Sequence, residues 1–306
     1  MSASSKKDEF LAFLLNYLDG LCISPTDLNS VDSSTPIDER VLALLESERY
    51  KQYIDKFDEI VTYIDDIRNP TGINKYCKEY ALKHGHINYT EETYTDAEGN
   101  IKHLIDKDNP YTFESEEEYR YIILDNFSNI TQEQGLSKMD TINKLSKYFI
   151  TLRDQLLYTI IAVQHQAQAQ EGIENRKMGL VKPSSDGLAD CKTTSRDCNM
   201  LFGLYSPFKY GIPDYEGYDI KQFKNYIRFL EVLEDRDYGA NGQICPLFFN
   251  GAVSVFHELP RATDPEMTDV YKYVNKLNTE KNTKAKISSA FLIFTNKIRN
   301  LWHQLR

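Results

Sequence analysis

Apolar positions at the start of the chain recur with a helical period. Between residues 9 and 21 they return every three or four positions, and a second such stretch covers residues 37–56. Between the two lie a Ser-Pro turn and the run Ser-Ser-Thr-Pro at residues 33–36, which is typical of a helix start. The pattern therefore predicts that the chain opens with two amphipathic helices.

Runs of β-branched and aromatic residues then predict buried strands. The first covers residues 59–66 and ends at Asn-Pro-Thr-Gly (69–72), which begins a helix running to Lys83. Two further runs, residues 119–126 and 158–163, are separated by a predicted helix over 137–154. Alternating strands and helices predict an α/β fold with a mostly parallel sheet and helices on both faces.

Residues 86–118 interrupt this alternation. Two segments of alternating polarity, residues 87–94 and 100–106, flank the turn Ala-Glu-Gly-Asn at 97–100. This arrangement is typical of a β-hairpin. We interpret residues 86–118 as an insertion.

The last third of the chain predicts strands first and helices afterwards. Strand patterns near residues 200–205, 225–233, 243–250 and 254–258 have no helices between them, which favours an antiparallel extension. Helical patterns follow over about 264–277 and 285–305, and the last helix packs either on its own domain or on a neighbouring subunit or partner. We therefore divide the chain into one domain, residues 1–260, and a C-terminal helical extension, residues 261–306.

Composition narrows the class of protein. The net charge of −10 argues against a broad nucleic-acid-binding face but leaves room for a small basic loop. No apolar run approaches the roughly 20 residues of a membrane span, and charged residues precede Phe10, so we expect a cytoplasmic protein without a membrane partner. Five widely spaced cysteines without a Cys-x-x-Cys pair predict neither a disulfide framework nor a zinc site.

Polar residues stand at the ends of two predicted neighbouring strands. Asp125 ends the run 119–126, and Gln164-His165-Gln166 follows the run 158–163. In nucleotide-binding α/β sheets these positions carry the acid that holds Mg²⁺ and the amide or imidazole that senses the γ-phosphate. Yet none of the fourteen glycines belongs to a Gly-x-x-x-x-Gly-Lys-[Ser/Thr] phosphate loop.

Four segments resemble the ATPase domain of the DnaB-type replicative hexameric helicases, a RecA-like family of bacteria and phages. Residues 122–125 resemble its Walker B strand, and residues 160–166 its strand ending in a sensor glutamine. The most specific segment is 183–199, where Pro-Ser-Ser-Asp leads to Arg-Asp-Cys-Asn. Residues 229–237 are similar to the strand whose arginine reaches the ATP of the adjacent subunit.

The resemblance spans about residues 8–260 and implies a RecA-like fold in an ATP- and Mg²⁺-driven ring that translocates on single-stranded DNA and unwinds duplex. Asp125 would bind the metal beside the nucleotide. His165 would sense the nucleotide, with Gln164 or Gln166 as alternatives in register, and Arg236 would act across the subunit interface. The structural alternative is that each of these side chains is an ordinary capping or ion-pairing group at a strand end.

The loop 166–182 is the candidate DNA contact. Arg176, Lys177 and Lys182 supply positive charge, and six copies in a ring would form a basic path for a phosphate backbone. The alternative is that residues 166–182 are only a surface loop that connects two elements. Glu234 stands where the family has a lysine near the trans-acting arginine, which reverses a charge there.

The missing phosphate loop leaves two interpretations. In the family, the loop and the catalytic glutamate precede the helix that matches residues 1–14, so we expect them upstream of Met1. The chain is then a truncated or split helicase of the phage or mobile-element type, inactive alone, whose P-loop comes from missing upstream sequence or from another chain. We expect its partner to be a homo-oligomeric ring or an upstream-encoded P-loop chain. The alternative is a non-hydrolysing helicase-like subunit that binds replication proteins. An upstream reading frame that encodes the loop would favour the first.

Overall fold

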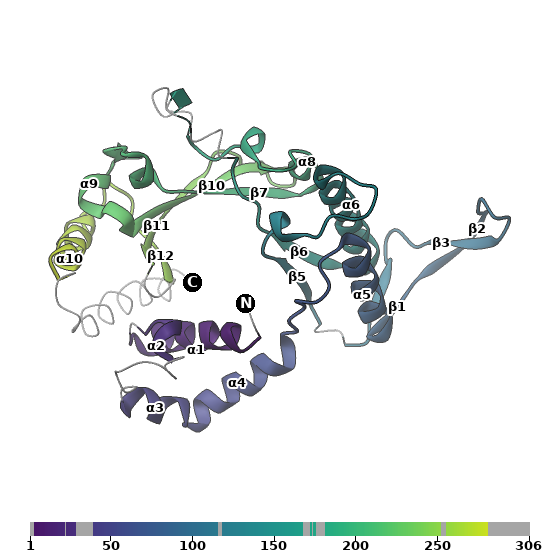
Figure 1. The fold of residues 1–306 in the computed structure, drawn as a ribbon, viewed down its shortest axis with the longest axis horizontal. Coiled ribbons are helices and arrows are strands. Elements are labelled where there is room, and N and C mark those ends of the chain that lie inside the picture. Colours follow the sequence, from purple (N-terminus) through teal and green to yellow (C-terminus); the bar gives the residue numbers. More distant parts are fainter. Residues whose placement is uncertain are drawn as a thin grey trace. The chain divides into compact units, whose positions relative to one another are not determined.

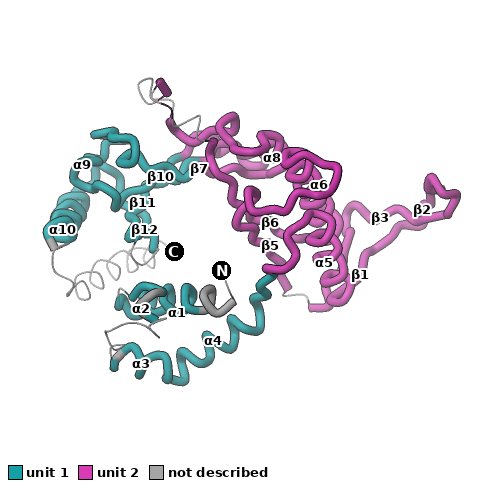
Figure 2. Tube along the Cα trace, in the orientation of Figure 1, with its two compact units in different colours: residues 1–64, 204–231, 244–306 teal, residues 65–203, 232–243 magenta. Residues whose placement is uncertain are grey.

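The computed structural model describes residues 3–21, 23–28, 39–115, 118–167, 172, 174–175, 181–251 and 255–280. The chain divides into two compact units (Figures 1 and 2). Unit 1 takes residues 1–64, 204–231 and 244–306, and unit 2 takes residues 65–203 and 232–243. The candidate strand tips both lie in unit 2.

Unit 1 begins with helices packed around a small apolar core. They are α1 (Ala3–Asp19), α2 (Pro25–Leu28), α3 (Glu39–Leu45) and α4 (Glu48–Ile60). The predicted second helix is thus two helices, because the Ser47 hydroxyl caps α4 by accepting from the Tyr50 amide. The buried Tyr50 then donates its hydroxyl to Asp19 at 2.5 Å, which ties α4 to α1.

The predicted strand over residues 59–66 is wrong. Helix α4 continues to Ile60, and residues 61–69 form no strand. Phe57 lies at helical spacing from Tyr50 and stacks on Phe10 of α1, with ring centroids 3.8 Å apart. This packing and the Ser47 cap extend the helix into a β-branched stretch, so tertiary contact overrides local propensity.

Unit 2 is built on one parallel strand pair. Strand β5 (Arg120–Leu124) pairs with β6 (Tyr158–Ala162), from Arg120 opposite Tyr158 to Leu124 opposite Ala162. Helices α5 (Pro70–Lys83) and α6 (Lys138–Leu156) share a buried core with one face of the pair (Figure 1). Ile122, Leu124 and Ile160 pack into that core.

The expectation of a mostly parallel sheet is not met in the described residues. β5–β6 is parallel, whereas the other pairs with a defined register are antiparallel. Residues 61–69 form no strand, so that stretch adds no parallel neighbour to β5. In the described part of unit 2, helices cover one face of the pair and not both, as the exposure of Ile123 on the other face shows.

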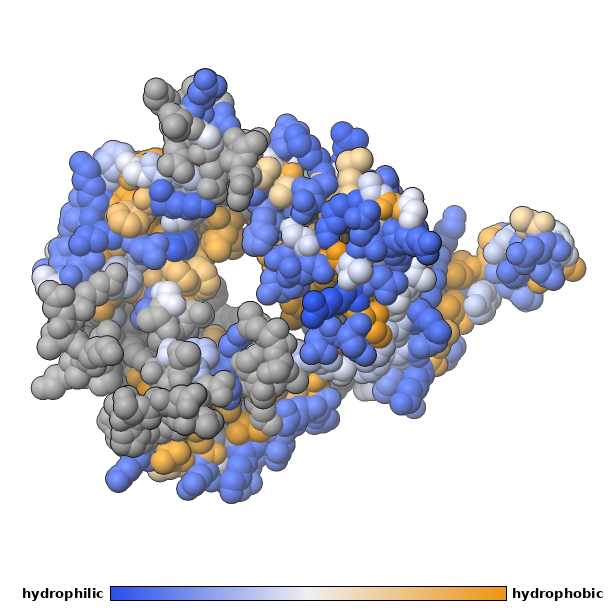
Figure 3. Space-filling view, viewed as in Figure 1, coloured by the Kyte–Doolittle hydropathy of each residue, from blue (hydrophilic) through white to orange (hydrophobic). Residues whose placement is uncertain are grey.

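The predicted hairpin is present and forms a two-part arm. Its root pairs β1 (Gly85–Ile87) with β4 (Tyr111–Phe113), and its outer part pairs β2 (Tyr89–Thr95) with β3 (Ile101–Ile105). Asp96 closes the tip by accepting from the amides of Glu98 and Asn100. Figure 3 shows exposed hydrophobic as well as hydrophilic atoms along this ribbon, and Ile101 is 75% exposed.

Arg120 fastens this arm to the core and is itself almost fully buried. Its guanidinium donates to Glu118, to the Tyr111 hydroxyl and to the His84 carbonyl at 2.6, 2.8 and 2.8 Å. Four aromatic rings lie 4.8–5.9 Å from its Cζ atom, which adds cation–π attraction. One side chain therefore joins the start of β5, the end of α5 and the root of the arm.

The late strands form a four-stranded sheet in the order β12-β11-β10-β7. They are β7 (Met200–Tyr205), β10 (Ile227–Asp235), β11 (Ile244–Asn250) and β12 (Val255–Glu258). The β10–β11 and β11–β12 pairs are antiparallel, in line with the expected extension. The remaining elements are η1 (Phe127–Asn129), η3 (Ser185–Gly187), α8 (Thr194–Asp197), η4 (Pro207–Tyr210), β8 (Asp214–Tyr215), β9 (Tyr218–Asp219), α9 (Ile220–Phe223), η5 (Lys224–Tyr226) and α10 (Met267–Glu280).

The predicted helix over 264–277 corresponds to α10, whereas the predicted helix over 285–305 lies outside the described residues. None of the described helices is long and apolar enough to cross a membrane.

The substitution Arg120→Met tests whether Arg120 holds the arm on the core of unit 2. Arg120→Met removes the three hydrogen bonds and leaves Glu118 unpaired, so we expect a loss of about 2–4 kcal/mol in the free energy of unfolding. Urea denaturation measures it. Arg49→Met is the matched control, because Arg49 makes a half-exposed ion pair with Asp19, and its loss should change stability by less than about 1 kcal/mol. Equal effects of the two substitutions would contradict the anchoring role.

The Glu133 carboxylate makes the stability of the α5–α6 contact depend on pH. It accepts from Lys144 at 2.6 Å and from the Thr71 amide at 2.7 Å, and these bonds, that to Lys144 first, lower its pKa to about 2. Because folding lowers the pKa of Glu133, its ionised carboxylate stabilises the fold fully at pH values above its ordinary pKa of 4.5. This stabilisation is lost as the pH falls toward 2. The difference in the free energy of unfolding between wild type and Glu133→Gln should therefore be constant above about pH 5 and shrink below it. Urea denaturation at a series of pH values measures this difference. A difference independent of pH would contradict this assignment.

Candidate functional site

The β5–β6 register brings the two candidate strand tips to one edge of unit 2. Asp125 follows Leu124 directly, and Gln164 and His165 follow the end of β6 by two and three positions. Two bonds continue the pairing beyond the strands: the Val163 amide donates to the Leu124 carbonyl, and the Phe127 amide to the Val163 carbonyl. The polar residues after both strands are thus held in one layer.

A hydrogen bond between Asn126 and His165 joins the two tips. The Asn126 Nδ2 atom lies 3.0 Å from His165 Nε2, and Asn126 is buried whereas His165 is exposed. Asn126 Oδ1 accepts from the Ser128 amide at 2.9 Å, which sets the orientation of the amide group. The Nδ2 group therefore donates to Nε2, and His165 carries its proton on Nδ1.

Asp125 presents its carboxylate to solvent beside this bond. Its side chain is exposed and makes no hydrogen bond or ion pair with any described residue. Within the described ranges, no group of three or more His, Cys, Asp or Glu side chains is arranged to hold a metal ion. A single carboxylate fits Mg²⁺, which keeps several waters and needs one or two protein carboxylates beside nucleotide phosphates.

Gln164 is fully engaged by its own segment. Its Nε2 atom donates to the carbonyls of Ala189 and Cys191 at 2.5 and 2.7 Å, and its Oε1 atom accepts from the Thr194 hydroxyl at 2.6 Å. These bonds attach the segment 189–194 to the end of β6. The geometry leaves His165 as the side chain that meets Asn126.

Gln166 lies in the same layer and reaches Ser184. Its Nε2 atom donates to the Ser184 carbonyl at 3.1 Å, and Gln166 forms an isolated bridge with Leu188. Ser128 donates to Asp190 at 2.7 Å, so the loop after β5 is tied to the same segment. The segment 184–194 is thus bonded to the tips of both parallel strands.

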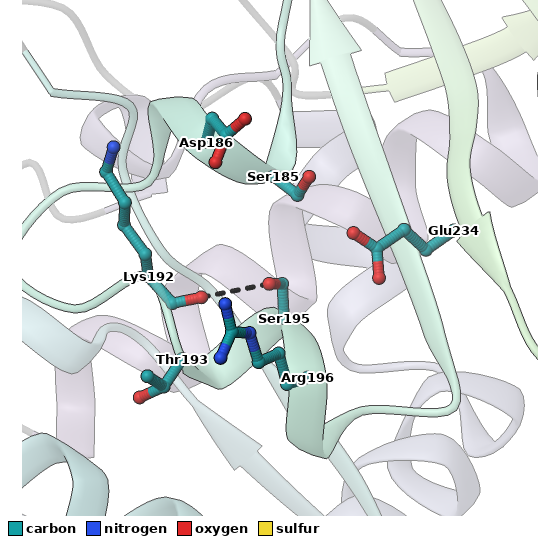
Figure 4. Close-up of a pocket in the computed structure, with 7 residues that line it drawn as sticks. All are labelled: Ser185, Asp186, Lys192, Thr193, Ser195, Arg196 and Glu234. Atoms are coloured by element: carbon teal, nitrogen blue, oxygen red, sulfur yellow. Dashed lines mark hydrogen bonds between the residues drawn. The ribbon is translucent and has the colours of Figure 1, made fainter.

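The segment that resembles the helicases most specifically lines a shallow cavity of about 230 Å³ (Figure 4). Two cationic side chains, Lys192 and Arg196, and two acids, Asp186 and Glu234, lie around it with hydroxyl groups between them. The segment is held on α6, since Asp197 accepts from Ser146 and Lys147 at 2.7 and 2.6 Å. The cavity residues are Ser185, Asp186, Lys192, Thr193, Ser195, Arg196 and Glu234.

Arg236 stands immediately after β10 with an exposed side chain. Its amide donates to the Asn199 carbonyl at 3.1 Å, and its guanidinium makes no hydrogen bond or ion pair within the part of the chain that the structure describes. Asp235 shapes this turn by accepting from the amides of Ala240, Tyr238 and Asp237, and these bonds hold the pKa of its carboxyl below the usual value. The turn thus directs Arg236 to solvent.

Of the predicted DNA contacts, Lys182 is described and exposed, while Arg176 and Lys177 lie outside the described residues. Sequence reasoning missed Asn126 as the partner of His165, and Lys192 and Arg196 as cavity residues. Asn126 follows Asp125 directly, so a polar residue next to a strand-end acid was the available signal. The cavity could not be read from the sequence, because Glu234 joins it from another strand.

No model of a protein family and no curated protein sequence matches the chain. Solved structures do match. One is described as an "ATPase Domain", with a TM-score of 0.53 and 12% identity over 85% of this chain and 72% of that one. Another is "The Structure Of A DnaB-Like Replicative Helicase And Its Interactions With Primase", with a TM-score of 0.55 and 12% identity over 85% of this chain and 49% of that one.

The chain therefore has the fold of DnaB-like replicative helicase ATPase domains, as the motif resemblance predicted. It spans about half the length of the second structure.

The proton position on His165 tests the Asn126–His165 bond. Wild-type protein should show an unprotonated Nε2 atom in ¹⁵N NMR of the imidazole, because Asn126 donates to it. Asn126→Asp replaces the donor with an acceptor, so Nε2 should become protonated in the variant. An Nε2 proton in both proteins would contradict this orientation of the Asn126 amide.

Proposed function

We propose that this chain is part of the motor of a DnaB-type replicative DNA helicase, and that it works with ATP, Mg²⁺ and single-stranded DNA once a P-loop is supplied. The observation that carries this proposal is the Asn126–His165 hydrogen bond, which joins the tips of two parallel strands beside the exposed Asp125. Ligands of α/β sheets bind at such carboxyl ends of strands. The DnaB-like fold of the chain gives independent support.

Asp125 would hold the Mg²⁺ that accompanies the nucleotide. Its carboxylate is exposed and unpaired in the described residues, so binding a cation breaks no existing ion pair. The ion would supply neutralisation of phosphate charge. Asp125 would act directly or through a bound water.

His165 would sense the nucleotide. With Nε2 engaged by Asn126, its Nδ1–H group remains to donate to a γ-phosphate oxygen or an attacking water. The backbone of His165 accepts from the Ala189 amide at 2.9 Å, so its movement would be felt in the segment 184–194. Gln164 would contribute by keeping that segment attached to β6.

Arg236 would act on the nucleotide of an adjacent subunit in a homo-oligomeric ring. An exposed guanidinium on an ordered turn suits an arginine finger, which stabilises negative charge that develops during phosphoryl transfer. Glu234 lies in the cavity two residues earlier and reverses a charge that the family carries there.

Single-stranded DNA would be followed by the basic loop and the adjoining cavity. Arg176, Lys177 and Lys182 precede the segment that places Lys192 and Arg196 on the cavity wall. Cations along one path contact phosphates without reading bases, and a ring multiplies their number. This allows an acidic subunit to bind DNA at one place.

A second candidate function is a non-hydrolysing helicase-like subunit that binds other replication proteins. The glutamate at position 234, where the helicase family has a lysine, favours it. Under this proposal the helicase fold binds a partner protein and does not hydrolyse ATP. Nucleotide binding separates the two candidates.

The test is Mg²⁺-dependent binding of a fluorescent ATP analogue and DNA-stimulated hydrolysis, with this chain alone and mixed with the product of the adjacent upstream reading frame. We expect activity in the mixture only. Asp125→Asn should abolish the Mg²⁺-dependent part, and Arg236→Ala should lower turnover by roughly 10³-fold or more.

Asp108→Asn is the matched control, because Asp108 is an exposed acid on the arm of the same unit. It should leave both activities unchanged. No nucleotide binding in any mixture would rule out the motor and leave the docking subunit.

A further inference from the structure

One face of the four-stranded sheet is covered within unit 1. Ile227 of β10 lies opposite Phe248 of β11, and both side chains are fully buried. Tyr215 packs on Phe229 of the same face, with ring centroids 4.6 Å apart. Tyr273 of α10 packs on Phe248, with ring centroids 5.9 Å apart. We call this side of the strands the covered face.

The alternate positions of the same strands form the opposite face, which we call the open face. Arg228 of β10 lies opposite Leu247 of β11, and Phe249 of β11 lies opposite Phe256 of β12. The two phenylalanine rings stack with their centroids 4.6 Å apart, yet Phe256 is 41% exposed. Arg228, Leu247 and Phe249 are only half-buried. A sheet normally buries an apolar face against another element, and the described residues leave this face without the cover that the opposite face has.

Leu204 extends the open face onto β7. The next residue, Tyr205, is buried, and its ring centroid lies 5.2 Å from that of Tyr215 over the covered face. Successive residues of a strand point to opposite faces, so Leu204 points to the open face, where it is 52% exposed. The apolar residues of the open face in unit 1 are Leu204, Leu230, Cys245, Leu247, Phe249 and Phe256.

Glu258 places a carboxylate on the open face. It lies opposite Leu247 in the β11–β12 register, and it is exposed. Burial first, and the Glu258 carboxylate second, raise the pKa of the Cys245 thiol, so this carboxylate acts on the apolar part of the face. The guanidinium of Arg228 already donates to two backbone carbonyls, at 3.0 and 2.7 Å. The open face therefore suits an apolar ligand that carries positive charge.

Residues 281–306 follow α10, lie outside the described residues and have a complementary sequence pattern. They contain six Lys and Arg residues and no Asp or Glu, although the whole chain has a net charge of −10. A helix over this stretch would have Lys297 and Arg299 on either side of one apolar stripe. The stripe consists of residues spaced by three or four positions: Ile287, Phe291, Phe294, Ile298, Trp302 and Leu305.

We propose that residues 287–305 form an amphipathic helix that packs its apolar stripe on the open face, with its basic flank beside Glu258. At 1.5 Å per residue the helix is about 28 Å long. Strand β11 has seven residues and is about 23 Å long, so the helix covers it from end to end. The proposal stands apart from the proposed function, because it needs neither nucleotide nor DNA.

The connection to α10 favours this occupant over a second copy of the chain. Helix α10 is held in unit 1, since Val270 and Val274 are buried and Asn278 donates to the Gln222 carbonyl at 2.8 Å. Residues 281–286 then join the proposed helix to α10. A short connection of this kind gives an effective concentration in about the millimolar range, which a separate copy reaches only at a similar protein concentration.

The experiment uses the fluorescence of Trp302, which is the single tryptophan of the chain. In the full wild-type chain, packing on the open face should shift its emission to shorter wavelength than that of free tryptophan and protect it from acrylamide quenching. Phe256→Glu puts a charge under the helix, so the emission should move to longer wavelength and the quenching should rise. Leu204→Glu is a second variant on the same face and should act in the same direction.

Phe208→Glu is the matched control, because Phe208 is 42% exposed and lies in the same unit on η4, outside the open face. It should leave the emission unchanged, and thermal unfolding checks that all variants keep the fold. Three results would overturn the proposal. One is a wild-type emission like that of free tryptophan, and another is an equal shift in Phe208→Glu and Phe256→Glu. The third is a short-wavelength emission that is lost on dilution together with a dimer in analytical ultracentrifugation, because a second copy would then be the occupant.

Discussion

The parallel register of β5 with β6 is the constraint on which the candidate site depends. Both strands have five residues, and they pair from end to end without a shift. Leu157, at φ 54°, ends α6 in the left-handed region and turns the chain directly into β6. A one-residue slip of β5 would move Ile122 out of the core, and a one-residue slip of β6 would do the same to Ile160. Either slip would carry His165 away from Asn126.

Most polar side chains at this edge bond to one another or to nearby backbone, and these bonded groups differ from those that stay exposed. Gln164, Ser128 and Asn126 hold the segment 184–194 and the loop after β5 in place. Asp125 and His165 remain exposed at the same edge. Electrostatic interactions of exposed polar groups are weak in water, so excluding water from this edge would strengthen the interactions of Asp125 and His165 with a ligand.

How far the sequence predicts this molecule differs between elements. The hairpin, the strand–helix–strand unit around α6 and the late antiparallel strands follow from periodicity, because each buries a regular apolar face or closes on a clear turn. The strand expected at 59–66 failed, since the Phe57–Phe10 contact extends α4 through residues with β propensity. Motif resemblance located the strand-end positions Asp125 and His165, but their neighbours arise from contacts distant in sequence. Asn126 meets His165 across 39 positions, and Glu234 joins the cavity of residues 185–196 from β10.

Paramagnetic NMR tests most directly whether the tips of β5 and β6 form a metal–nucleotide site. Mn²⁺ replaces Mg²⁺ in the presence of ATP and the product of the adjacent upstream reading frame. The spectra follow the signals of Asn126 and His165, with His103 on the arm as a reference. If the site lies at these tips, the signals of Asn126 and His165 broaden while that of His103 remains sharp. Equal broadening of all three signals, or none at the strand tips, would contradict the proposed site.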